Sequence, residues 1–237
     1  MLVDREKCVG CGQCVPYCPC IAIHMDEKKK AVIDLERCYE CGICLLVGSC
    51  KFDALVYQEM SGPRLTRYYY NNVLVKNPVT GMTGRGTAEM KTNELTNKYA
   101  ADEVGFGIEL GRPDVGANFR DVQLITMALA GIGIKFDAGA PTTLEMEDPS
   151  LGTFPEAILD ERIICSIVEF KAKTTMLPRI IDVLRKVEQK IDTVFSVDMV
   201  SRAQVDGSLP NVDIVKSLGV TVRPNAKTTV GLGRANV

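Results

Sequence analysis

The sequence predicts an α+β protein of two domains. Of its 237 residues ten are cysteines, and nine of these fall within the first 50 positions. From residue 102 onward the apolar residues alternate between strand and helix spacing, in the order strand, helix, strand, strand, helix, strand. About 180 residues follow the cysteine-rich segment, enough for a second domain with its own core. We therefore expect boundaries that divide the chain into residues 1–58, 59–101, 102–203 and 204–237.

Two runs of cysteines dominate the N-terminal segment. The first has the spacing C-x2-C-x2-C-x3-C-P, and the second has C-x2-C-x2-C followed by one further cysteine. In the first pattern three thiolates bind one iron-sulfur cluster, and the fourth, next to proline, binds a second cluster. The crossed assignment therefore gives one cluster Cys8, Cys11, Cys14 and Cys50, and gives the other Cys18, Cys38, Cys41 and Cys44. We expect two [4Fe-4S] clusters.

The two runs also form an internal duplication. The fourth cysteines are followed at the same offset by the similar pairs Ala22-Ile23 and Ala54-Leu55. The first 58 residues, about a quarter of the chain, thus resemble the bacterial two-cluster ferredoxin family, and the resemblance implies a domain that carries electrons. The chain departs from that family at the second run, where five residues precede Cys50 and lysine replaces the proline after it.

Two alternatives concern the thiols. Cys20 competes with Cys18 or Cys50 as a fourth ligand, or is a small buried side chain that lines a cluster site. Pairs of cysteines at C-x2-C spacing also occur in structural zinc sites. Zinc sites consist of two such pairs, however, whereas this chain has triplets with a crossing fourth cysteine.

Composition limits the class of partner. The formal net charge is -2, and each oxidised cluster with four thiolates adds a charge of about -2. This acidity argues against nucleic acid. The amino terminus has no apolar signal region, and no run of apolar residues is long enough for a membrane span. With oxygen-sensitive clusters, these features favour the cytoplasm of an organism that lives largely without oxygen.

Residues 21–100 contain few regular patterns. We expect a hairpin over residues 21–37, and a strand in the apolar stretch that includes three consecutive tyrosines and ends at Val75. A glycine-rich loop follows, and its candidate anion-binding or partner-binding residues are Gly81, Gly84, Arg85 and Gly86. A flexible connection between domains is the alternative. Residues 91–98 predict further turns, and the only histidine, His24, receives no role.

The C-terminal half predicts a βαββαβ ferredoxin-like sandwich. Strands are expected at residues 104–110, 132–136, 161–170 and 193–200, with one helix beginning near Asn118 and a second containing the apolar stripe from Leu177 to Val187. Cys165 falls inside the third strand and should be buried. A short helix at residues 211–218 precedes a second polar glycine segment, whose candidate residues are Gly231 and Arg234. The two glycine segments could meet at an anionic ligand or at a partner, or the terminal one is mobile.

These observations favour an electron conduit. Fully ligated clusters carry single electrons and perform no group chemistry. The sequence contains no flavin or nicotinamide fingerprint, no nucleophile with a histidine base, and no HExxH metal site, so no catalytic residue is predicted. The leading hypothesis is an electron-transfer subunit of an anaerobic oxidoreductase, in a hetero-oligomer with a catalytic subunit or flavoprotein. The alternatives are a reductase that binds a small anion or flavin between the glycine segments and the sandwich, and a redox or ligand sensor.

Overall fold

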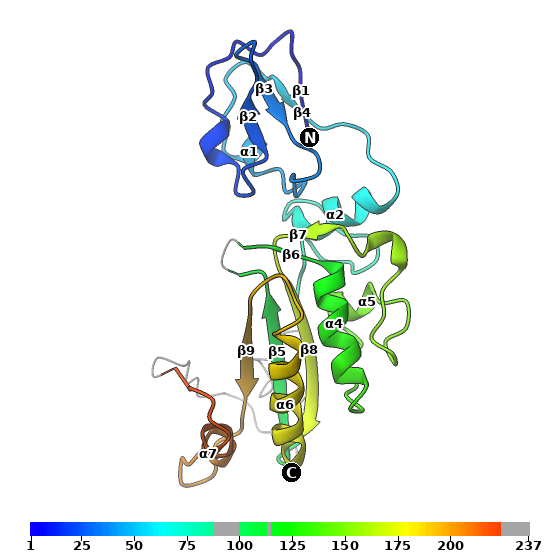
Figure 1. Cartoon of the computed structure of the whole chain (residues 1–237), viewed down its shortest axis with the longest axis vertical. Coiled ribbons are helices and arrows are strands. Elements are labelled where there is room, and N and C mark those ends of the chain that lie inside the picture. The colour runs from blue at the N-terminus through cyan, green and yellow to red at the C-terminus, as the bar shows by residue number, and fades with distance from the viewer. Residues whose placement is uncertain (88–99, 113–114, 224–237) are drawn as a thin grey trace.

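The structure is a computed structural model that describes residues 1–87, 100–112 and 115–223. Helix α2 (Pro63–Asn71) lies between a small N-terminal domain and a larger C-terminal one (Figure 1). Within the described residues, no helix has the length and apolar character needed to cross a membrane.

Two short antiparallel pairs build the N-terminal domain. Strand β1 (Leu2–Val3) pairs with β4 (Leu55–Val56), and β2 (Ile23–Met25) pairs with β3 (Ala31–Ile33). The second pair confirms the expected hairpin. The remaining elements are the 3-10 helix η1 (Val15–Tyr17) and helix α1 (Ile43–Leu46), each of which follows the third cysteine of its run or includes it.

The backbone repeats the duplication seen in the sequence. Left-handed φ angles occur at three pairs of matched positions, which are Gly10 and Glu40, Gly12 and Gly42, and Ile21 and Asp53. Such angles are unfavourable for Ile and Glu, and their recurrence at matched positions shows that the two cysteine loops have the same backbone course. The two additional residues before Cys50 are accommodated by α1 and a left-handed turn at Gly48.

The prediction of a strand that ends at Val75 is wrong, because the three tyrosines lie in helix α2. Proline occupies its first turn, where a missing N–H costs nothing. Its buried residues are Arg67, Tyr70 and Asn71, whose spacing of three and four positions is that of one helix face. Tyr70 is 1 % exposed and belongs to the core of the larger domain, so that core extends beyond the boundary expected at residue 102.

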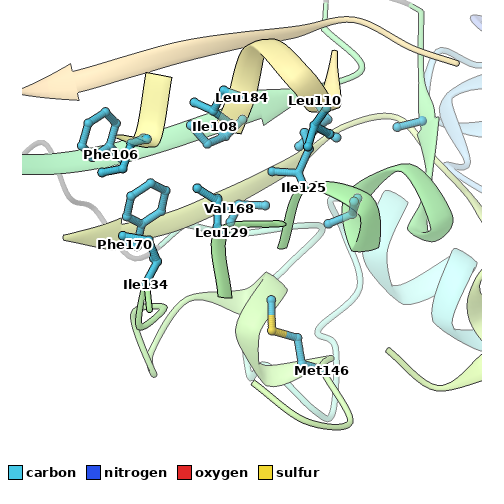
Figure 2. Packing of buried hydrophobic residues seen from close by; sticks show 14 of the residues in the cluster. Phe106, Ile108, Leu110, Ile125, Leu129, Ile134, Met146, Val168, Phe170 and Leu184 are labelled. Carbon is cyan, nitrogen blue, oxygen red and sulfur yellow. The ribbon is translucent and has the colours of Figure 1, made fainter. Parts of the chain in front are cut away.

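A three-stranded antiparallel sheet forms the centre of the larger domain. Its order is β8 (Ser166–Lys173), β5 (Glu103–Leu110), β9 (Phe195–Val200). Helices α4 (Phe119–Ala130) and α6 (Leu177–Val187) pack against it and against each other. The side chains between these layers form the core (Figure 2). The rings of Phe106 and Phe170 are stacked there, with 4.9 Å between their centroids. The mixed α+β class is therefore confirmed.

The sheet differs from the expected one in two places. Residues 132–136 form no strand, and only Phe136 makes a bridge, to Phe170 of β8. The expected third strand is interrupted, because β7 (Arg162–Ile163) pairs with β6 (Ala117–Asn118) in a separate ribbon. Cys165 lies in the break and is half-buried, so its placement inside a buried strand is wrong.

Shorter helical elements complete the larger domain. Helix α5 (Pro141–Leu144) follows a short irregular segment after Phe136. The 3-10 helix η3 (Glu156–Ile158) precedes β7, and the 3-10 helix η4 (Thr174–Met176) precedes α6. The expected C-terminal helix is present as α7 (Pro210–Ser217), and Gly219 follows it in a left-handed conformation. At the start of α4, Asn118 and Asp121 form a capping box, which explains why the helix begins there.

Candidate metal centres

The structure gathers the predicted cysteines into two sites. Site I is defined by the four cysteines Cys8, Cys11, Cys14 and Cys50, which line one cavity together with Val9 and Phe52. Cys11 is exposed, whereas Cys8 and Cys14 are buried. The wall of site I is therefore open to solvent at Cys11, and exposed apolar side chains lie beside it.

Site II is defined by the cysteines Cys18, Cys38, Cys41 and Cys44, which line a second cavity. The last three are buried and Cys18 is half-buried. A fifth cysteine, Cys20, lines the same cavity. The fourth cysteine of each run thus shares a cavity with the three closely spaced cysteines of the other run.

Equivalent backbone contacts hold the two fourth cysteines. The amide of Ala22 donates to Cys18 Sγ at 3.2 Å, and the amide of Ala54 donates to Cys50 Sγ at 3.4 Å. Both alanines are almost fully buried, so a larger side chain would displace the turn. This burial accounts for the matched alanines that follow each run.

The donor set fits a metal cluster better than a single ion. In the part of the chain that the structure describes, no three His, Cys, Asp or Glu side chains converge closely enough to hold one metal ion. Each set of four thiols instead lines one shared cavity. Four sulfur ligands around a larger body are the arrangement that [4Fe-4S] clusters require.

Burial keeps the thiols of Cys38, Cys41 and Cys44 neutral in the absence of metal, whereas the hydrogen bond with Cys20 lowers the pKa of Cys18 to about 5. Burial raises the pKa of Cys44 to about 12 and, with the Glu40 carboxylate, raises the pKa of Cys38 to about 11. Burial also raises the pKa of Cys41. Because metal binds the thiolate form, loading of this site must release protons.

Comparison with known protein families agrees with this geometry. Residues 7–54 match the family model described as a 4Fe-4S dicluster domain. This segment is a ferredoxin-type domain. The match covers only that segment, and neither curated proteins nor solved structures match the chain.

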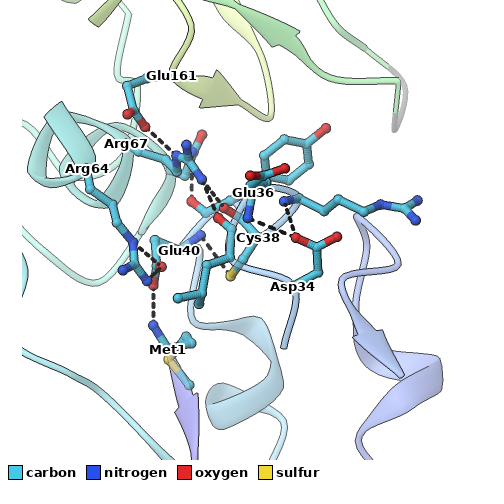
Figure 3. Close-up of polar contacts among 12 residues, drawn as sticks. Met1, Asp34, Glu36, Cys38, Glu40, Arg64, Arg67 and Glu161 are labelled. Atoms are coloured by element: carbon cyan, nitrogen blue, oxygen red, sulfur yellow. Dashed lines mark hydrogen bonds and ion pairs between the residues drawn. The ribbon is translucent and has the colours of Figure 1, made fainter. Parts of the chain in front are cut away.

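Two arginines of α2 bind the loop of the ferredoxin-type domain that carries Cys38 and Cys41 (Figure 3). Arg67 donates through Nη1 to the carbonyl oxygens of Leu35 at 2.8 Å and Cys38 at 2.9 Å, and its Nε pairs with Glu161 of the larger domain. Arg64 pairs with Glu40, which is fully buried and also contacts the amino group of Met1. Site II is thereby tied to the larger domain through charged groups.

Asn71 makes the second connection. Its Nδ2 donates to the carbonyl oxygens of Tyr39 at 2.8 Å and Arg162 at 2.9 Å, and its Oδ1 accepts from the amide of Ile164 at 2.8 Å. Tyr39 also packs against Gly116, where an added Cβ would lie 1.9 Å from the tyrosine oxygen. Tyr39, one of the two residues between Cys38 and Cys41, is thus fixed directly to the larger domain.

The first glycine segment is folded onto the larger domain as far as the structure describes it. Asn77 Nδ2 donates to Glu145 at 2.8 Å, and Arg85 Nε donates to Cys165 Sγ at 2.9 Å. At these two residues the segment is hydrogen-bonded to the larger domain. The amides of Gly81 and Gly84 donate to backbone carbonyls. Both amides are therefore hydrogen-bonded within the chain itself. Gly86 lies against Met82 and Pro141.

Other predictions for polar segments fall outside the described residues. These are the turns at residues 91–98 and the candidate residues Gly231 and Arg234. His24 is exposed on β2 and takes no part in either site. Arg64, Arg67 and Asn71 are not among the residues predicted from the sequence, because the tyrosines beside them suggested a strand. Their spacing of three and four positions was the signal that could have identified a common face.

Proposed function

We propose that the chain is an iron-sulfur electron-transfer subunit that exchanges single, low-potential electrons with a catalytic partner. The 4Fe-4S dicluster domain supports the electron-transfer role. In this proposal site I and site II each hold one [4Fe-4S] cluster through the cysteines that define them. A fully ligated cluster supplies one-electron chemistry and leaves bond making to the partner.

The contrast between the two sites carries the proposal. Site I has the exposed Cys11 beside Val9 and Phe52, which are 56 % and 47 % exposed. Site II lies in the half of the domain that Arg67 and Asn71 connect to the larger domain. Electrons would pass between the exposed site I and the catalytic subunit or flavoprotein, while the larger domain would hold the ferredoxin-type domain from the side of site II.

The test is electron delivery to the partner that co-purifies with the native protein under anaerobic conditions. The clusters are reduced with dithionite, excess reductant is removed, and reoxidation after addition of the partner is followed in the visible spectrum. Phe52→Glu should slow reoxidation at least several-fold without changing the iron content. Leu151→Glu is the control, since Leu151 is similarly exposed on the larger domain. Catalytic reduction of an organic substrate by the isolated chain would refute the conduit.

One observation favours the alternative, a self-contained reductase. Asn71 bridges the carbonyl of Tyr39 and the amide of Ile164, which precedes Cys165 and its contact Arg85. These hydrogen bonds connect the loop of Cys38 and Cys41 to the half-buried Arg85, whose guanidinium group suits a small anionic substrate or a flavin phosphate. A flavin absorption band near about 450 nm in the purified chain would support it, and broad iron-sulfur absorption alone would support the conduit.

We also propose that the larger domain is a reduced form of the βαββαβ sandwich. The order β9, β5, β8 is that of three of its four strands. The bridge from Phe136 to Phe170 occupies the place that the missing strand would take beside β8. Since this architecture hosts many functions, it does not decide between the two candidates.

A further inference from the structure

Five cysteines line site II, although a cluster of this type takes four thiolates. The fifth is Cys20, whose Sγ lies 3.5 Å from the Sγ of Cys18. Both side chains are half-buried and both line the same cavity as the buried triplet. Cys20 therefore lines the cavity in which the proposed cluster would be held.

Local sequence explains why Cys18 and Cys20 face the same way. Cys18 has extended φ and ψ angles of -86° and 109°, as expected for a residue before proline. Pro19 and Cys20 then form a turn, which is closed by a hydrogen bond from the Ile21 amide to the Cys18 carbonyl oxygen at 3.2 Å. Ile21 then takes a left-handed conformation, which turns the chain toward β2. The two thiols are thus presented together by the sequence Cys18-Pro19-Cys20.

The duplication provides an internal comparison. Phe52 stands two residues after Cys50, as Cys20 stands two residues after Cys18, and Phe52 lines the cavity of site I. This position therefore faces the cavity in both repeats. At site I it carries an aromatic ring that cannot ligate iron, whereas at site II it carries a thiol that can.

We propose that Cys20 is an exchangeable fourth ligand of the cluster in site II and can replace Cys18. This inference rests on the proposed cluster assignment. In the exchange the iron–sulfur bond of Cys18 breaks and one to Cys20 forms, while the proton of the Cys20 thiol passes to the Cys18 sulfur. Charge and oxidation state are unchanged, so the step needs no oxidant or reductant. Site II alone keeps its cluster when its fourth ligand is lost.

The test compares iron content in matched variants purified without oxygen. Wild type should contain about eight iron atoms per chain. Cys18→Ala and Cys20→Ala should each keep about eight, and Cys18→Ala/Cys20→Ala should fall to about four. Cys50→Ala is the control, because Phe52 cannot replace it, and this variant should also fall to about four. In the Cys50→Ala background, Phe52→Cys should restore part of the lost iron.

Thiol alkylation of the loaded protein, read by mass spectrometry, gives a second measurement. Cys20 should react with iodoacetamide in wild type and become protected in Cys18→Ala. If Cys18→Ala loses as much iron as Cys50→Ala and its Cys20 still reacts, the exchange is overturned while the cluster assignment stands. Wild-type iron far below about eight would instead overturn the assignment. These two failures are therefore distinguishable.

Discussion

Replacing Arg67 by alanine should uncouple the two domains. Arg67 is 10 % exposed and its partner Glu161 is 15 % exposed, so water screens this ion pair little. The substitution leaves Glu161 without its cation and leaves the carbonyl oxygens of Leu35 and Cys38 without their shared donor. Loss of one partner of a buried pair costs about 3–5 kcal/mol, because the remaining charge stays desolvated.

We therefore expect the free energy of unfolding to fall by about 4 kcal/mol. The two hydrogen bonds are not added to this figure, since all three interactions share one guanidinium group. Removing both charges in Arg67→Ala/Glu161→Ala should recover about 1–3 kcal/mol relative to the single variant. The control is Arg120→Ala, whose ion pair with Asp160 is exposed and contributes about 0–1 kcal/mol.

The assay is anaerobic urea unfolding of the cluster-loaded protein, followed by circular dichroism and by iron-sulfur absorption. In wild type the two signals should change at similar urea concentrations, because the interface couples the domains. In Arg67→Ala the absorption should be lost at lower urea than the helical signal. Coincident transitions, with a midpoint no lower than that of Arg120→Ala, would refute this account of the interface.

Three further predictions concern stability. Gly116→Ala should lower the free energy of unfolding more than Gly133→Ala. Both positions have left-handed φ, but only at Gly116 would the new Cβ collide with Tyr39. We expect chemical unfolding to show a difference of about 1–3 kcal/mol between the two variants. Tyr70→Phe should lower the free energy of unfolding by about 1–2 kcal/mol, because its buried hydroxyl bonds to those of two other residues at 3.0 Å; an unchanged midpoint would contradict this. Burial raises the pKa of Glu145 above its ordinary value of 4.5, so its protonated form favours the fold and this contribution is lost as the pH rises through the raised pKa. Glu145→Gln should accordingly be more stable than wild type at about pH 8 and lose that advantage toward about pH 5, and a constant difference across this range would argue against the cause.

The cysteine spacing predicted the character of the N-terminal domain because cluster ligation requires local geometry. Three thiols at C-x2-C-x2-C must lie on one tight loop, and the crossing fourth cysteine follows from the duplication. The structure gathers the same two sets of four. Apolar periodicity likewise predicted α4 and α6, since each must bury one continuous face.

The sequence by itself determined the electron-carrying domain, the mixed class of the larger domain and the positions of its main helices. Each of these depends on contacts or ligands close together in the chain. Only the tertiary structure decided that α2 is a helix, that residues 132–136 form no strand, and that Arg67 and Asn71 connect site II to Glu161 and Ile164. The residues of α2 bind partners that are about 90 or more positions away in the sequence. A local sequence pattern does not indicate which distant carbonyl or carboxylate will be buried beside it.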